Sequence, residues 1–309
     1  NLIMPNKIKT VFFGTQDFAA AILKSLLDSE TVSVDLVFTQ PDRKVGRKQI
    51  VEESPVKKLA LANGIAVQQP ESLKNLALSA YNLELGIVTQ YGLIIPKNII
   101  DSFPQGMINV HGSLLPKYRG ASPIQAALIN GEKETGVTIM LMDEKMDHGP
   151  ILSQKEMSVD PDDTYAALAA KMAILGSKLL LDAITGYLSN KIRPQEQAHE
   201  QATFTKLLTK EGGLVDFNKT NAEIYNQYRG LTPWPGIWTT LEGKRLKLLE
   251  IRKSEKTLPA GQILSENKKI FIGCNQGSIE ILELQLEGKL AMDAKTFLNG
   301  YKNFDVVRL

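Results

Sequence analysis

The chain is organised around GMINVHGSLLP, residues 106–116. Residues 107–110 form a short apolar run that ends at a Gly/Ser turn, which predicts a buried strand running into a loop. Asn109 and His111 are two positions apart, so they share one face where that strand ends. The sequence therefore aims an amide and an imidazole at one spot.

A second stretch, GVTIMLMDEKMDHGPI at residues 136–151, supplies a carboxylate. Residues 137–142 are another β-branched and apolar run, and the polar turn after them carries Asp147 and His148. If the two strands lie side by side, Asp147 faces Asn109 and His111. Taken singly, each of these three residues is more often an ordinary turn or strand-end residue.

The trio suits an acyl or formyl transfer that has no covalent enzyme intermediate. An amine that attacks a formyl carbon leaves negative charge on the formyl oxygen, which an Asn amide and a protonated His can stabilise. One such donor contributes about 10² to 10³ in rate. The carboxylate of Asp147 can keep the imidazole charged and can accept the proton that the amine loses.

Composition indicates an ordinary globular protein. The 309 residues are 43% hydrophobic and 23% charged with a net charge of +2, which leaves room for two domains. The excess of Lys and Arg in the last third permits an anionic partner without demanding one. The single cysteine, Cys274, fits a reducing compartment, and no apolar run approaches the roughly 20 residues of a membrane span. We expect a cytoplasmic monomer without a membrane segment.

Strands alternate with helices through the first 188 residues. Apolar runs at 8–13, 32–39, 65–67 and 83–89 alternate with helical patterns, including one at 18–27 that Thr15 or Asp17 would cap. A long apolar helix ending near residue 188 is expected to pack on the sheet. This pattern predicts an α/β domain with a Rossmann-like, mostly parallel sheet over residues 1–188.

The rest of the chain has a different pattern. Residues 189–203 are polar and lack periodicity, so we expect an interdomain linker in which His199 is solvated. Short alternating strands separated by turns then predict a small C-terminal β-barrel of the oligonucleotide-binding (OB) kind over residues 204–309. Trp234 and Trp238, which flank prolines before a strand, are expected to anchor its core.

Motifs along nearly the whole chain resemble the folate-dependent formyltransferases, and among them those that act on initiator methionyl-tRNA. The matching stretches are GTQDFA at residue 14, FTQPDRKVGRK at 38, YGLIIPK at 91, NVHGSLLPKYRGASPIQAAL at 109, ETGVTIMLMD at 134, KLLTKEGGLVDF at 206 and RGLTPWPGIW at 229. Two places depart from the family pattern, at Gln16 and at Thr89-Gln90.

The resemblance implies transfer of a formyl group from 10-formyltetrahydrofolate, without a metal, to the α-amino group of the methionine on initiator tRNA, for translation initiation. It implies Asn109, His111 and Asp147 as the catalytic residues. Folate-contacting positions fall in two places on the chain: Ser113, Leu114, Leu115 and Pro116, and beside them Tyr91, Gly92, Leu93 and Ile94.

Residues 40–50 are predicted to form a basic loop that contains a glycine. By composition alone, such a loop is more often a solvated surface segment than a binding site. In the family this loop enters the end of the tRNA acceptor stem, and Arg47 matches the wedge position. The residues expected to contact tRNA are Arg43, Lys44, Arg47 and Lys48 in the loop and Lys206 and Lys210 after the linker. Such contacts weaken with salt because they release counterions.

Other readings remain open at this point. The same trio fits a formyltransferase of a small amine, such as a nucleotide sugar or glycinamide ribonucleotide, and a formyltetrahydrofolate hydrolase. A dinucleotide-binding protein is disfavoured because only Gly14 follows the first strand, without G-x-G-x-x-G. A metal hydrolase built from His111, Asp147 and His148 lacks further nearby ligands.

Overall fold

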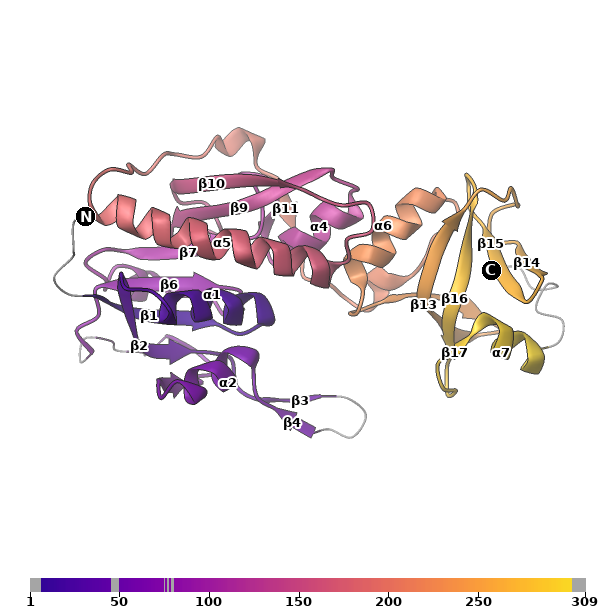
Figure 1. Ribbon diagram of the computed structural model, residues 1–309, viewed down its shortest axis with the longest axis horizontal. Coiled ribbons are helices and arrows are strands. Elements are labelled where there is room, and N and C mark those ends of the chain that lie inside the picture. The colour runs from indigo at the N-terminus through magenta and orange to yellow at the C-terminus, as the bar shows by residue number, and fades with distance from the viewer. Residues whose placement is uncertain (1–6, 46–49, 75, 77, 79–80, 302–309) are drawn as a thin grey trace. The chain divides into compact units, whose positions relative to one another are not determined.

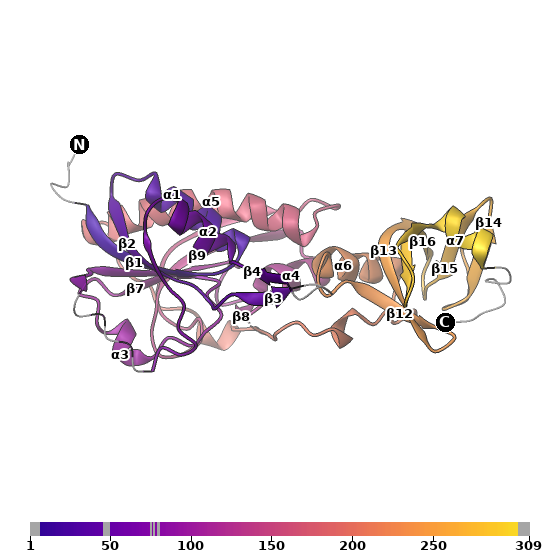
Figure 2. The same ribbon diagram turned by 90° about the horizontal axis from the view of Figure 1, so that it is seen from below.

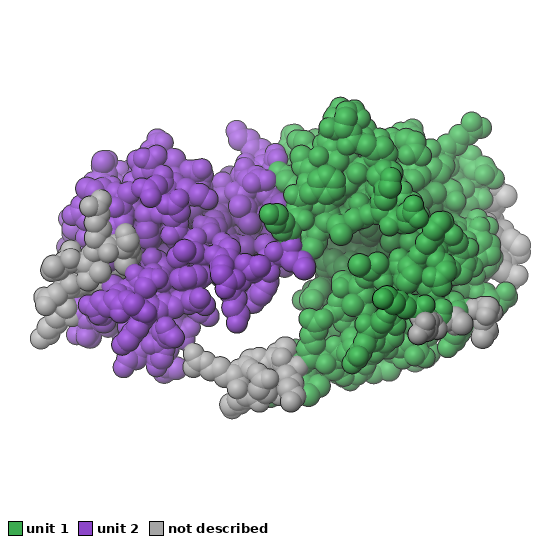
Figure 3. Space-filling view, turned by 180° about the vertical axis from the view of Figure 1, so that it is seen from behind, with its two compact units in different colours: residues 1–123, 134–158, 169–206 green, residues 124–133, 159–168, 207–309 purple. Residues whose placement is uncertain are grey.

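The computed structural model describes residues 7–45, 50–74, 76, 78 and 81–301. The chain forms two compact units, coloured separately in Figure 3. The first comprises residues 1–123, 134–158 and 169–206, and the second comprises residues 124–133, 159–168 and 207–309. No helix in the described part of the chain is long and apolar enough to cross a membrane.

The first unit is built on a seven-stranded sheet (Figure 1). In spatial order its strands are β10 (Ile151–Ser158), β9 (Glu134–Leu141), β7 (Met107–His111), β6 (Leu85–Thr89), β1 (Ile8–Gly14), β2 (Val32–Phe38) and β5 (Ala66–Gln68). The pairs from β7 to β5 are parallel, whereas β9 is antiparallel to both β7 and β10. The expected mostly parallel sheet is confirmed.

The helices of the first unit are α1 (Asp17–Leu27), α2 (Pro55–Ala62), α3 (Lys97–Ile100) and most of α5 (Tyr165–Leu188). α4 (Pro123–Ile129) belongs, from Ile124 on, to the second unit. Figures 1 and 2 show α1 and α5 over the same face of the sheet. A Cβ added at Gly176 of α5 would meet Val137, Ile22 and Val110 at 3.3–3.4 Å, so the helix lies directly on the sheet. The expected packing of the long apolar helix is confirmed.

Short elements complete the first unit. β3 (Arg43–Val45) and β4 (Ile50–Glu52) form an antiparallel hairpin, and β8 (Arg119–Gly120) pairs in parallel with β11 (Phe204–Thr205). A single 3-10 turn, η2, covers His199–Gln201.

The start of α1 differs from expectation. Neither Thr15 nor Asp17 caps it; the N-cap residue is Gln16, whose side chain makes no capping hydrogen bond. The Thr15 hydroxyl instead donates to the carbonyl oxygen of Tyr91 at 3.0 Å. This hydrogen bond to the turn after β6 takes the place of a local cap, and it fixes the position of that turn.

The second unit contains an antiparallel sheet whose strands, in spatial order, are β12 (Ile237–Leu241), β13 (Lys244–Ser254), β16 (Ser278–Leu286), β15 (Lys269–Gly273) and β14 (Ile263–Glu266), with β17 (Met292–Asp293) beside β16. Its remaining elements are η3 (Glu211–Gly213), α6 (Asn221–Leu231), which begins with a Thr220/Glu223 capping box, and α7 (Ala294–Gly300). The expected C-terminal β domain is confirmed as an antiparallel sheet, and its closure into an OB-type barrel stays a prediction.

The tryptophans do not anchor that domain. Trp234 is 56% exposed, and the core is formed by aliphatic side chains together with Phe217, Cys274 and Phe297. Trp238 is half-buried, donates its indole N–H to the carbonyl oxygen of Lys210 at 2.8 Å and lies 4.0 Å beneath the Arg245 guanidinium. The expectation of two core anchors was wrong, because proline-rich context alone does not decide which face a tryptophan takes.

Candidate active site

Strands β7 and β9 lie side by side, as expected, but they run in opposite directions. Asn109 pairs with Met140 and His111 with Thr138, so the C-terminal end of β9 lies beside Ile108. Residues 142–150 connect that end to β10. This loop carries Asp147 back over the Asn109/His111 face of β7.

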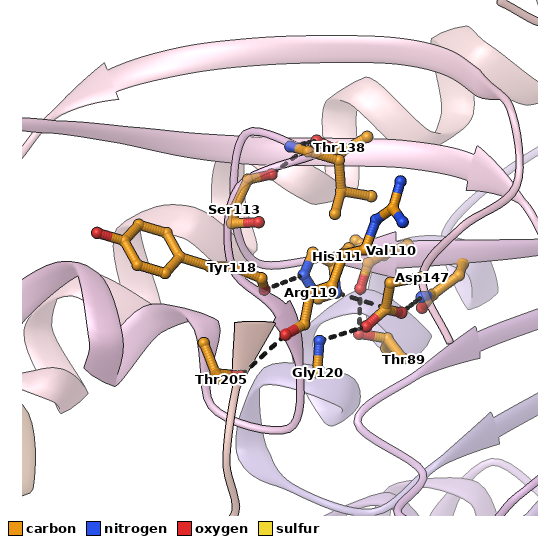
Figure 4. Close-up of polar contacts among 12 residues, drawn as sticks. Thr89, Val110, His111, Ser113, Tyr118, Arg119, Gly120, Thr138, Asp147 and Thr205 are labelled. Atoms are coloured by element: carbon orange, nitrogen blue, oxygen red, sulfur yellow. Dashed lines mark hydrogen bonds and ion pairs between the residues drawn. The ribbon is translucent and has the colours of Figure 1, made fainter. Parts of the chain in front are cut away.

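The three expected catalytic side chains meet at this edge, where Figure 4 shows His111 beside Asp147. The Asn109 amide Nδ2 donates to Asp147 Oδ1 at 3.1 Å, and His111 Nδ1 lies 3.6 Å from the same oxygen. The backbone N–H of Gly120 donates to Asp147 Oδ2 at 2.7 Å. The carboxylate is therefore held from both sides, and its side chain is only 14% exposed.

His111 has a defined orientation. Its Nε2 lies 3.0 Å from the carbonyl oxygen of Tyr118, and since a carbonyl only accepts, Nε2 carries a hydrogen. The ring atom that faces Asp147 is therefore Nδ1. If His111 is to donate a hydrogen bond on that side, it must be doubly protonated.

The turn that supplies these backbone partners has left-handed residues. Tyr118 has φ 61°, Gly120 φ 112° and Asp147 itself φ 49°. A Cβ at Gly120 would lie 2.6 Å from the carbonyl oxygen of Thr205, so the β8–β11 pairing requires a glycine there. The Gly120 N–H that binds Asp147 depends on that close approach.

Side chains of β9 and β10 form hydrogen bonds with the backbone of the strip from Ser113 to Pro116. The Thr138 hydroxyl donates to Ser113 O at 2.6 Å and accepts from Leu115 N at 3.1 Å, and Gln154 Nε2 donates to Leu115 O at 2.9 Å. Ser113 and Leu115 are buried, whereas Leu114 and Pro116 are partly exposed. Any contact of this strip with a ligand would fall to the latter two.

The turn after β6 is the other expected donor-binding segment. Tyr91 is buried, Leu93 is partly exposed, and Ile94 is 89% exposed. The Tyr91 carbonyl accepts from Gln40 Nε2 at 2.9 Å as well as from Thr15. The buried Oε1 of Gln90 has no hydrogen-bond partner within the described structure. Exposed Ile94 and partly exposed Leu93 offer the kind of apolar surface that a pterin ring needs.

The basic loop is described only in part. Arg43 is exposed, and its Nη2 donates to Gln40 Oε1; Lys44 lies in β3. Arg47 and Lys48 lie outside the described residues. Lys206 and Lys210 are both exposed, the first in the first unit and the second in the other.

Residues 189–203, expected to be a linker, contact the site. Gln197 is buried, and its Nε2 donates to the carbonyl oxygens of Asp147 at 2.9 Å and Gly149 at 2.8 Å. His199 is exposed, as expected, but it has partners: its ring stacks on His148 with centroids 4.0 Å apart, and Arg119 Nη2 contacts its Nδ1 at 2.8 Å.

His148 is not arranged as a metal ligand beside Asp147. Its Nδ1 donates to Asp143 Oδ2 at 2.6 Å while its ring stacks on His199. Within the ranges that the structure describes, no group of three or more His, Cys, Asp or Glu side chains could hold a metal ion.

Family comparison agrees with this geometry across both units. A family model described as formyl transferase matches residues 7–184, and one described as formyl transferase, C-terminal domain, matches residues 207–302. The chain belongs to the formyltransferase family.

This formyltransferase has close relatives in bacteria. It is 41% identical to the methionyl-tRNA formyltransferase of Streptococcus agalactiae, over 94% of this chain and 95% of that one. It is 40% identical to the enzyme of the same name from Myxococcus xanthus, over 95% of both chains.

Solved structures share the formyltransferase fold at lower identity. An N-formyltransferase from Helicobacter canadensis, in complex with folinic acid and dTDP-3-aminofucose, matches with a TM-score of 0.67 and 21% identity, over 89% of this chain and 98% of that one. HypX from Aquifex aeolicus in complex with tetrahydrofolic acid matches with a TM-score of 0.65 and 14% identity, over 97% of this chain and 48% of its own. At these identities the likeness shows the fold alone.

Sequence reasoning missed the groups that hold this formyltransferase's trio in place. The Tyr118 carbonyl and the Gly120 N–H belong to the LLPKYRG stretch that was singled out, but backbone partners leave no signal in residue type. Gln197 lies 50 positions from Asp147 in a stretch without periodicity, so nothing in the sequence marked it.

Proposed function

We propose that this protein transfers a formyl group from 10-formyltetrahydrofolate to the α-amino group of the methionine carried by initiator tRNA. The observation that carries the proposal is the 40–42% identity to enzymes named methionyl-tRNA formyltransferases over 94–95% of the chain, which spans both units. Because its product starts translation, we expect the reaction in the cytoplasm. A monomer remains a prediction.

Asn109 and His111 are proposed to stabilise the oxygen that becomes negative as the amine adds to the formyl carbon. Asn109 Nδ2 and His111 Nδ1 both face Asp147 Oδ1, so donors from two side chains converge on one region. With Nε2 bound to Tyr118, only Nδ1 of His111 is free to take part. Donors fixed in this way need no reorganisation during the reaction.

Asp147 is proposed to accept the proton that the attacking amine loses. Its Oδ1 already lies against Asn109 and His111, and its Oδ2 is fixed by the Gly120 N–H. These contacts hold the carboxylate beside the two proposed donors. General-base catalysis of this kind contributes about 10² to 10⁴ in rate.

The donor is proposed to lie on the Tyr91–Ile94 turn and on the exposed parts of Leu114 and Pro116. Exposed Ile94 offers an apolar contact for the donor. When bound, 10-formyltetrahydrofolate supplies the formyl group and leaves as tetrahydrofolate.

The acceptor tRNA is proposed to bind the basic hairpin of β3 and β4 and its connecting loop. Arg43 and Lys44 belong to β3, and the sequence adds Arg47 and Lys48. Lys206 and Lys210 are exposed cations that can contact phosphates. A small amine acceptor would require none of these residues.

Transfer of labelled formyl from 10-formyltetrahydrofolate tests the proposal when methionyl initiator tRNA, methionyl elongator tRNA, a dTDP-amino sugar and water are offered in parallel. We expect label on the initiator tRNA alone. Label on the sugar would instead identify a small-amine formyltransferase, and free formate with no transfer would identify a hydrolase.

A further inference from the structure

Gln197 binds the main chain on both sides of residue 148 through one side-chain amide. Its Nε2 donates to the carbonyl oxygens of Asp147 and Gly149 at 2.9 and 2.8 Å, and the side chain is buried. Both hydrogens of the amide are used, and both go to the loop that presents the proposed general base. Through these two bonds Gln197 contacts the backbone of the loop and not the side chain of Asp147.

The other end of the same amide is also fixed. Gln197 Oε1 accepts from Arg119 Nη2 at 2.6 Å and from Arg119 Nε at 3.2 Å. Arg119 is 4% exposed and is held in turn by His199 Nδ1 and by the β8–β11 ladder. Because an arginine only donates, it orients the Gln197 amide with its N–H groups toward the Asp147 loop.

The loop needs an external support of this kind. Asp147 has φ 49°, in the left-handed region that is strained for an L-residue, and this strain favours relaxation of the loop when nothing opposes it. Gly149 permits the arrangement because a Cβ there would overlap the carbonyl oxygen of Leu141. Relaxation would move the carboxylate away from Asn109 and the Gly120 N–H.

We infer that Gln197 is a positioning residue for formyl transfer, which holds the Asp147 loop in its reactive conformation through hydrogen bonds to two carbonyl oxygens. The inference rests on the proposed function, because it acts through Asp147. A displacement of about 1 Å at a reacting group can cost about 10² in rate. Gln197→Ala is therefore expected to lower kcat about 10- to 100-fold while leaving the KM for donor and for tRNA within about twofold.

Two further variants separate positioning from a general effect on folding. Gln197→Glu keeps the side-chain size and the Arg119 contact but removes both donors, so it should lose kcat as Gln197→Ala does. Gln195→Ala changes an exposed residue of the same segment that pairs with Ile151 through backbone hydrogen bonds, so it should keep wild-type kcat.

A double-mutant cycle with Asp147→Asn gives the decisive test. If Gln197 acts through the Asp147 carboxylate, Gln197→Ala should cost less than about twofold in kcat once Asp147 is Asn. An equal loss in both backgrounds, or a KM that rises in place of a falling kcat, would overturn the inference.

The proposed function can fail separately. If the wild-type protein releases formate to water and forms no formyl-methionyl-tRNA, the proposed function is wrong. The same cycle, measured on formate release, then still decides the role of Gln197, since a hydrolase would use the same carboxylate.

Discussion

At the turn after β6, the Gln40 side chain occupies the space that a Cβ on Gly92 would need. The Gln40 amide reaches the carbonyl oxygen of Tyr91 at 2.9 Å, and a Cβ on Gly92 would overlap the Gln40 Nε2 atom. Gln40 also accepts from Arg43 at the start of the basic hairpin. The proposed donor turn and the proposed tRNA hairpin are therefore connected through one side chain.

Gly92→Ala should weaken donor binding. Gly92 has φ 82°, so alanine strains the backbone by about 1–2 kcal/mol and also displaces Gln40. Gly64→Ala is the matched control, because Gly64 has φ 71° but nothing within 4 Å of an added Cβ. Isothermal titration with the donor should show a raised Kd for Gly92→Ala only; equal affinities in the two variants would contradict the contact.

Thr138→Val should destabilise the first unit more than Thr10→Val does. The Thr138 hydroxyl donates to Ser113 O and accepts from Leu115 N and Gln154 Nε2, whereas the Thr10 hydroxyl donates to Ser33 O. Leaving buried polar groups unsatisfied costs about 1–3 kcal/mol each time. Urea unfolding measures both variants, and a smaller loss for Thr138→Val would refute this account of the strip.

Cys274 should resist alkylation in the folded protein. Burial raises the pKa of its thiol to about 11, so at pH 8 almost none is present as the reactive thiolate. Iodoacetamide at pH 8 should label it only after unfolding, and the labelling rate should rise as the pH approaches 11. Rapid labelling at pH 8 without loss of structure would show that the side chain is accessible.

Arg47→Ala should raise the KM for initiator tRNA with little change in donor affinity. The prediction comes from the sequence, since Arg47 lies outside the described residues, and its reason is the loss of a cation that contacts phosphate or an opened base. The slope of log K against log salt should fall by about one. Lys24→Ala, an exposed lysine paired with Asp28, serves as control. Unchanged discrimination between initiator and elongator tRNA would exclude the wedge role.

The sequence predicted the sheet and the shared face of Asn109 and His111 because both depend on local pattern, whereas the approach of Asp147 was expected only if the two strands lay side by side. Alternating apolar runs mark the strands, and a two-residue spacing places Asn109 and His111 on one face. The antiparallel direction of β9 was not predictable in this way, since it depends on how the loop at residues 142–150 turns back.

The supports of the site could not be predicted because they join distant parts of the chain. Thr15 binds Tyr91, 76 positions away, and Arg119 binds Gln197, 78 positions away. Short polar residues such as Thr15 prefer local caps when nothing else is near, and tertiary packing overrides that preference here. The stacking of His199 on His148 has the same origin.

The most direct test of the account is the single-turnover rate of formyl transfer to methionyl initiator tRNA, compared between wild type and Asp147→Asn at saturating donor. We predict a fall of about 10² or more in the rate with donor affinity retained, because the variant keeps the shape of the site and loses only the proton acceptor. A variant that transfers formyl at nearly the wild-type rate would contradict the assignment of Asp147 and with it the proposed mechanism.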